Sequence, residues 1–186
     1  SAGAAYVFAY EGTAWVQEAK LTLPDAAAFD FFGSSVAILA DRVFVGAPNK
    51  PSEIGAVYIF RRQGTAWVQE ARLLPPGACM PGFGISFGRV VSVYGDRALI
   101  GAEFPCDSNV ASPEGAAYVF RREGTNWLLE AQLPRPPGNS FVLGAGVSLS
   151  DNVALVAHLV GDHDPAASVY RRSDTMWSYE ALLGPL

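Results

Sequence analysis

The chain has 186 residues and a formal net charge of −5, with half of its residues apolar and only 17% charged. This composition is sufficient for a packed core, and the net charge offers no positive field for nucleic acid or an anionic membrane. No apolar run reaches the roughly 18 residues of a membrane-spanning helix. The 19 glycines and 13 prolines favour a turn-rich all-β protein.

One hairpin-like segment occurs four times along the chain. Its first three copies are GAAYVFAYEGTAWVQEAKL at Gly3–Leu21, GAVYIFRRQGTAWVQEARL at Gly55–Leu73 and GAAYVFRREGTNWLLEAQL at Gly115–Leu133. A more divergent copy, PAASVYRRSDTMWSYEALL, occupies Pro165–Leu183. Repetition at this spacing is typical of repeat architectures, and it is marked by four structural tryptophans: Trp15, Trp67, Trp127 and Trp177.

In chain order, the pattern predicts a half repeat at 3–23 and complete repeats at 32–74, 87–133 and 143–183, all in one domain. Each complete repeat has four short runs rich in Val, Ile, Tyr and Phe, separated by turn residues, which predicts four strands. In the first complete repeat these inner, second, third and outer strands are Phe32–Leu39, Arg42–Ala47, Gly55–Arg62 and Trp67–Leu74. The half repeat has only a third and an outer strand.

The runs AVYIF, SVAIL and VVSVY are apolar on both faces of a strand, because successive side chains point to opposite sides. Such sheets must be covered on both sides, yet no helical pattern is present to cover them. We therefore predict an all-β propeller of four-stranded antiparallel blades, with three complete blades and an N-terminal half blade. A β-sandwich is the alternative, but it does not account for a four-strand repeat.

The turn of the repeated hairpin is predicted at Gln63-Gly64, because glycine tolerates the positive φ of tight turns. Symmetric pairing about this turn predicts that Phe60 lies opposite Trp67. The equivalent pairs in the other copies are Phe8–Trp15, Phe120–Trp127 and Tyr170–Trp177. In the last copy Asp174 replaces the glycine, so we expect the least regular turn there.

The pair Phe32-Gly33, followed by Gly46-Ala47-Pro48, reads as an FG–GAP motif. Over nearly its whole length the chain resembles the FG-GAP repeats of integrin alpha-subunit propellers and their bacterial relatives. The motif departs from this pattern downstream, where Phe87-Gly88 precedes GAE and Leu143-Gly144 precedes AHL. The resemblance implies four-stranded blades and a role in extracellular recognition, in a secreted or cell-surface protein.

Integrin-type blades often carry a calcium loop between the inner and second strands, and such a loop needs several oxygen ligands at alternate positions. The corresponding connections here are the two-residue turns Ala40-Asp41, Gly95-Asp96 and Asp151-Asn152. We therefore predict no calcium in these turns, and no cofactor elsewhere.

In a propeller, the outer-to-inner and second-to-third connections share one face. Here they are the longest and least repetitive segments, so we place ligand binding on this loop face. The candidate binding residues are polar: Asn49, Lys50, Glu53, Glu103, Asp107, Asn109, Arg135, Asn139, His158, Asp162, His163 and Asp164. The segment 158–164 holds both histidines and would suit a transition metal, but its spacing matches no motif and a solvated acidic loop is the simpler interpretation.

Two further sets of residues have competing interpretations. Cys79 and Cys106, both in connections on the loop face, are predicted to form a disulfide, with two separate thiols as the alternative. The repeated arginines are predicted to pair with repeated glutamates at blade edges rather than to bind an anion. These charged residues are Arg61, Arg62, Arg121, Arg122, Arg171, Arg172, Glu18, Glu70, Glu130 and Glu180.

No catalytic constellation is present, since there is no GxSxG elbow, phosphate-binding glycine loop or convincing Cys–His pair. The leading hypothesis is a non-enzymatic recognition or adhesion module that binds protein or glycan through the loop face. One alternative is a structural unit that completes its ring as a homo-oligomer, because an open fragment exposes blade faces and edge strands. Completion by the remainder of a longer chain is another, and a glycan-acting enzyme is the least favoured.

Overall fold

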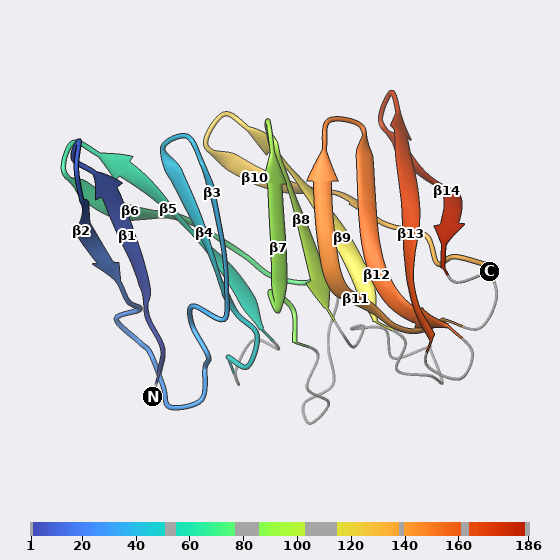
Figure 1. The fold of residues 1–186 in the computed structure, drawn as a ribbon, viewed down its shortest axis with the longest axis horizontal. Coiled ribbons are helices and arrows are strands. Elements are labelled where there is room, and N and C mark those ends of the chain that lie inside the picture. The colour runs from blue at the N-terminus through green and yellow to red at the C-terminus, as the bar shows by residue number, and fades with distance from the viewer. Residues whose placement is uncertain are drawn as a thin grey trace.

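A computed structural model of the chain describes residues 2–50, 55–76, 86–102, 115–137, 140–160 and 164–184. Fourteen strands in these residues form four antiparallel sheets, one with two strands and three with four (Figure 1). No helix occurs in the described residues. The sheets therefore confirm the predicted all-β fold of propeller blades with a partial first blade.

Each sheet contains strands that are consecutive in the sequence. The half blade consists of β1 (Ala5–Tyr10) and β2 (Trp15–Leu21). Blade 1 consists of β3 (Ser35–Leu39), β4 (Arg42–Ala47), β5 (Ala56–Gln63) and β6 (Ala66–Leu73). Blade 2 consists of β7 (Val90–Tyr94), β8 (Arg97–Ala102), β9 (Ala116–Glu123) and β10 (Asn126–Gln132). Blade 3 consists of β11 (Ser140–Ser150), β12 (Val153–Val160), β13 (Asp164–Ser173) and β14 (Met176–Leu183).

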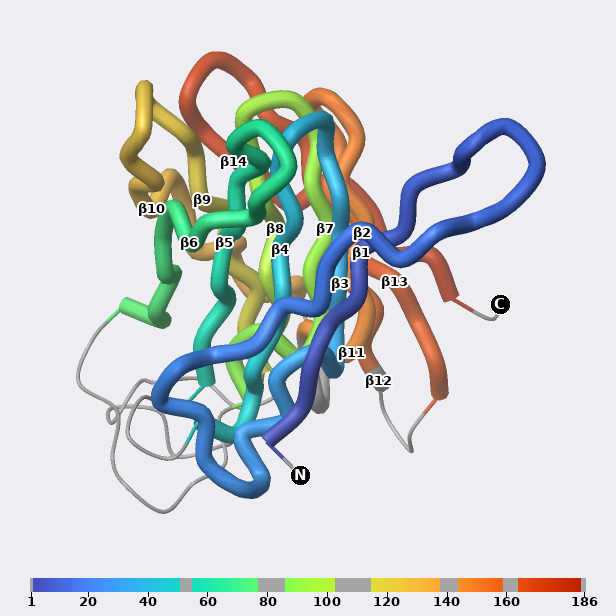
Figure 2. Tube along the Cα trace, turned by 90° about the vertical axis from the view of Figure 1, so that its left-hand side faces the viewer, coloured from blue at the N-terminus to red at the C-terminus, as the bar shows by residue number. Residues whose placement is uncertain are grey.

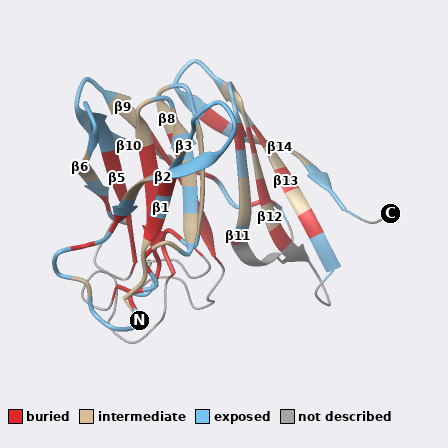
Figure 3. Cartoon of the chain, turned by 60° about the vertical axis from the view of Figure 1, so that its left-hand side comes forward, coloured by how far each residue is buried: buried red, intermediate tan, exposed pale blue. Residues whose placement is uncertain are grey.

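The hydrophobic core is divided into three clusters, each lying between two neighbouring sheets (Figure 3). In β4, Val45 belongs to the cluster shared with the half blade, whereas the adjacent Phe44 belongs to the cluster shared with blade 2. In β8, Leu99 belongs to the cluster between blades 2 and 3. This alternation explains why the strands are apolar on both faces.

The glycines of the FG–GAP motif lie where neighbouring blades touch through their backbones. A Cβ at Gly46 would overlap the carbonyl oxygen of Gly88 in the next blade. A Cβ at Gly101 would likewise overlap the carbonyl oxygen of Gly144. A side chain at either position would push two blades apart, so the motif sets the spacing between blades.

The register of the repeated hairpin differs from the prediction. Gly64, with a φ of 63°, is the first of two turn residues, and Gln63 pairs with Ala66. Glycine at the first central position is the requirement of a type II′ turn, so the turn centre lies one residue later than predicted. The predicted aromatic pairs are wrong in all four copies: the tryptophans lie opposite Tyr10, Arg62, Arg122 and Arg172.

The turn of the last copy is as regular as those of the second and third copies, contrary to expectation. Asp174 takes the place of the glycine with a φ of 53°, and Ser173 pairs with Met176 across the turn. Aspartate is one of the few non-glycine residues that adopt a positive φ, so it can replace glycine here. The two-residue turns predicted between inner and second strands are confirmed, because Leu39 pairs with Arg42 and equivalent pairs close the other two blades.

Candidate functional site

Every outer strand contains a β-bulge at its repeated glutamate. In β6, Gln69 lies opposite Phe60 and Ala71 lies opposite Ile59, so Glu70 is the extra residue. Glu18, Glu130 and Glu180 are bulged in the same way. A bulge re-aims the side chain that it carries, and here it directs each carboxylate to arginines.

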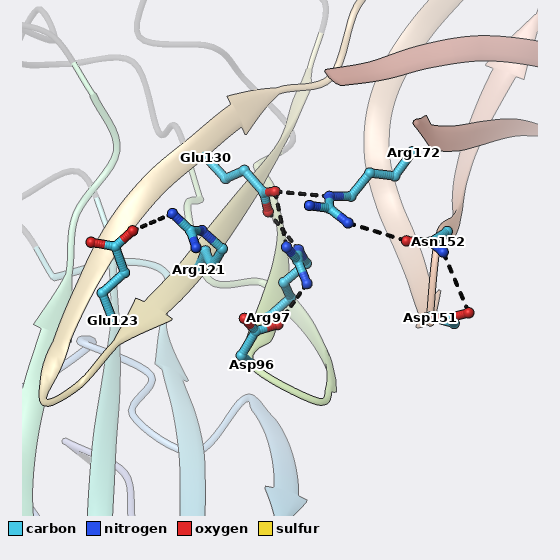
Figure 4. A network of polar contacts seen from close by, with 8 residues as sticks. All are labelled: Asp96, Arg97, Arg121, Glu123, Glu130, Asp151, Asn152 and Arg172. Carbon is cyan, nitrogen blue, oxygen red and sulfur yellow. Dashed lines mark hydrogen bonds and ion pairs between the residues drawn. The ribbon is translucent and has the colours of Figure 1, made fainter. Parts of the chain in front are cut away.

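The arginines and glutamates form a network that links blades (Figure 4). Arg97 donates two hydrogen bonds to Glu130, at 2.7 and 3.2 Å, within blade 2. Arg172 of blade 3 donates a third, at 3.0 Å, to the same carboxylate. Arg62 of blade 1 forms an equivalent ion pair with Glu18 of the half blade, at 2.6 Å. Glutamates therefore accept most of the repeated guanidinium groups, and nothing in the network suggests an anion site.

A second polar cluster lies on the loop face. The connection from β2 to β3 and the segment after β4 meet at the same end of the blades, opposite the tight turns (Figures 1 and 2). Lys50 extends its ammonium group to the buried carboxylate of Asp30, 3.4 Å away. The same ammonium lies 3.0 Å from both the backbone carbonyl and the carboxylate of Asp25. The cluster fastens the segment 24–31 to the start of the second-to-third connection.

The electrostatics of this cluster favour its charged form. Burial alone would lower the pKa of Lys50, but the neighbouring carboxylates outweigh it and hold that pKa above its ordinary value. The hydrogen bond from Lys50 lowers the pKa of Asp25. The backbone N–H of Ala27 also donates to Asp30, at 2.8 Å. Asp30 is therefore held from two sides.

Two phenylalanines flank the buried Asp30 and point away from the core. Phe29 and Phe31 are 68% and 49% exposed, and their ring centroids are 6.5 Å apart in an edge-on arrangement. Both have a positive φ, 74° and 53°. Such a conformation costs about 1–3 kcal/mol per non-glycine residue and persists only where surrounding contacts impose it. The Asp30–Lys50 contact supplies that constraint, so the loop displays a fixed aromatic pair to solvent.

The predicted site residues fall into different surroundings. Asn49 is exposed beside Lys50, Arg135 is exposed in the connection after β10, and Asp164 is exposed at the start of β13. Lys50 is buried in the ion cluster rather than available to a ligand. The other predicted polar residues and both cysteines lie outside the described residues: Glu53, Glu103, Asp107, Asn109, Asn139, Asp162, His163, Cys79 and Cys106.

His158 lies in the core rather than on the loop face. It is buried on β12, between blades 2 and 3, and its Nε2 lies 3.2 Å from the hydroxyl of Ser168. Burial lowers the pKa of His158. Within the described residues, no group of three or more His, Cys, Asp or Glu side chains could hold a metal ion.

The first of the turns that would correspond to integrin calcium loops does not fit a cation. Asp41 is the only carboxylate in its two-residue turn, and its oxygens contact the guanidinium groups of Arg42 and Arg61. A calcium loop offers several free oxygen ligands, which this turn does not supply.

Sequence reasoning missed the residues that give the loop face its shape: Asp25, Phe29, Asp30 and Phe31. The available signal was the run FDFF in a connection, where exposed phenylalanines are unusual. The tertiary contact with Lys50, 20 residues away, was not visible in the sequence.

Comparison with known families gives a match over just over half of the chain. The family model described as FG-GAP repeat matches residues 15–60 and 67–120. No curated protein matches the chain. In the described residues, no helix has the length and apolar character needed to cross a membrane.

Proposed function

Because this chain belongs to the FG-GAP repeat family of β-propeller repeats, we propose that it is a non-enzymatic recognition module that binds an extracellular protein through its loop face. The observation that supports this function is the Phe29–Phe31 pair, held open to solvent by strained backbone around a buried ion cluster. An extracytoplasmic location is part of the proposal, since the family is typically extracellular.

Fixed aromatic side chains are well suited to protein recognition. They bury a large apolar area at a low cost in conformational entropy, and they are common among the residues that dominate binding energy. Phenylalanine has no polar atom with which to orient a sugar hydroxyl, so a partner with an apolar pocket fits this pair better than a glycan does.

The test is binding of the labelled chain to an array of secreted and cell-surface proteins, with a glycan array in parallel. The double variant Phe29→Ser/Phe31→Ser is expected to lower the protein-array signal by at least about tenfold, the effect of losing a central aromatic contact. Tyr94→Ser is the control, because Tyr94 is also exposed but lies beside a tight turn at the opposite end of the blade. An unchanged signal in the double variant, or binding confined to glycans, would contradict the proposed function.

A further inference from the structure

The half blade presents an aromatic face that the other blades bury. Tyr6, Phe8 and Trp15 are 51%, 50% and 70% exposed. Their counterparts in blade 1 include Tyr58 and Phe60, which are buried in the cluster shared with the half blade. The exposed face is therefore an inter-blade surface to which no neighbouring blade of the described chain is docked.

Blade 3 carries the opposite kind of surface at the other end of the row (Figure 1). In blade 1, Phe44 and Ile59 pair across β4 and β5 and pack on blade 2. Leu155 and Val169 pair in the same way across β12 and β13, but both are only partly buried. Leu183 on β14 is exposed on the same side. Blade 3 thus presents apolar residues where blades 1 and 2 receive their next neighbour.

This surface of blade 3 cannot receive a complete blade in the usual way. In blade 1, the backbone of the next FG motif packs directly against Gly46. The equivalent residue of blade 3 is Ala157, and its methyl group fills the space that the backbone of an FG motif would need. Gly55, with a φ of 90°, forms a bridge to Phe87 of the next blade. Its counterpart is Pro165, whose ring restricts φ to negative values. Both sites that accept an FG motif are therefore lost.

The inner strand of blade 3 is also polar on this side. Ser148 and Ser150 are exposed, whereas the same positions in blade 1 are Ala37 and Leu39, which pack on blade 2. The surface is therefore apolar over the second, third and outer strands and polar over the inner strand. The half blade, described with a third and an outer strand only, covers just the apolar part.

The charges at the two surfaces are also matched. In blade 1, Arg62 pairs with the glutamate of the preceding sheet, Glu18. The equivalent residue of the half blade is Tyr10. From this position the half blade therefore brings no arginine to Glu180 of blade 3. Glu180 instead accepts two hydrogen bonds from Arg171 of its own blade, at 2.9 and 3.1 Å.

We propose that the aromatic face of the half blade packs against the outward face of blade 3 of a second copy of this chain. The two faces lie at opposite ends of the row of blades, so one molecule offers both halves of a head-to-tail contact. A heterologous contact of this kind closes into a ring or continues into a longer array.

Sedimentation velocity at micromolar concentrations tests the contact with one variant on each face. Phe8→Asp and Leu183→Asp are each expected to weaken self-association by at least about tenfold, because each buries a charge in the interface. Tyr94→Asp is the matched control, since Tyr94, beside the tight turn of blade 2, is nearly as exposed as Phe8. Thermal unfolding by circular dichroism establishes that all three variants are folded.

The decisive measurement is a mixture of Phe8→Asp and Leu183→Asp. Each variant keeps the face that the other lacks, so the mixture is expected to form a one-to-one dimer that neither variant forms alone. A monomeric wild-type chain would overturn the proposal. A second result would also overturn it: Leu183→Asp alone still self-associates, and mixing it with Phe8→Asp restores no association of the Phe8→Asp chain. The half blade would then pack on a second half blade.

Discussion

At the scale of single residues, blade 3 differs from its neighbours by an exchange of side-chain volume across its core. His158 and Ser168 occupy the positions at which blade 1 has Ala47 and Tyr58. The ring moves from the third strand to the second, and core substitutions that conserve total volume are the ones best tolerated. The exchange also introduces an imidazole into the core: His158 is buried, and its Nδ1 has no hydrogen-bond partner in the described residues.

We expect His158 to make stability depend on pH. Its pKa in the folded chain is lowered from 6.5 by burial, so as pH falls below about 6.5 the unfolded chain binds a proton that the folded chain does not. Stability should therefore be complete above that value and decline below it. Urea unfolding of the wild type and of His158→Gln at about pH 7.5 and about pH 5.5 measures the difference. If both proteins lose stability in parallel, His158 is not the cause.

At the scale of elements, the outer strand combines a local irregularity with a long-range contact. The bulge at Glu130 places a nearly buried carboxylate between Arg97 and Arg172, which come from two different blades. Burial alone would raise the pKa of Glu130, but the two guanidinium groups outweigh it and hold the pKa below its ordinary value. The periodic pattern predicted the strand, and the repeat predicted a paired glutamate, but neither revealed the bulge.

Glu130→Gln is expected to lower the free energy of unfolding by about 3 kcal/mol, because it removes the carboxylate that Arg172 pairs with and leaves Arg97 only the more exposed Asp96. Glu180→Gln is the matched control: it removes the same bulged residue, but Glu180 is exposed and contacts one arginine. Its cost should stay below about 1 kcal/mol. Chemical denaturation of both variants provides the comparison, and equal costs would show that the inter-blade contact contributes nothing.

At the scale of the whole molecule, the position of a blade in the row decides what a repeated residue does. Trp177 is buried between blades 2 and 3, whereas Trp15 is exposed because no blade of the described chain precedes the half blade. The inner strand shows the same effect: Val36 and Ile38 are exposed beside the half blade, while their counterparts Val91 and Val93 pack on blade 1.

Trp177→Ala is expected to cost about 3–5 kcal/mol of stability, the usual range for a buried tryptophan. Trp15→Ala should cost less than about 1 kcal/mol when the chain is monomeric, although the two tryptophans occupy equivalent positions of the repeat. Thermal or urea unfolding of dilute samples measures both. A similar loss in the two variants would mean that the half blade has a packing partner even in the monomer.

Much of the fold could be predicted from the sequence, because each blade must bury the same apolar surfaces and therefore repeats the same residues. Strands that are apolar on both faces required sheets covered on both sides, and the recurrence of four runs required four-stranded blades. The two-residue turns between inner and second strands followed from glycine and aspartate chemistry alone. The hairpin register did not, because one glycine is compatible with two turn centres that differ by a residue.

What only the tertiary structure decided are the contacts between residues distant in sequence. Three features depend on how the connections and blades pack together: the Asp30–Lys50 cluster, the exposure of Phe29 and Phe31, and the burial of His158. Local sequence patterns carry no information about such tertiary contacts. The same holds for the two ends of the row. The sequence determined that an unpaired half blade exists, but only its place at the end of the row explains why Trp15 is exposed. Likewise, the effect of Ala157 and Pro165 in blade 3 is clear only from the inter-blade contacts of the glycines that they replace in blade 1.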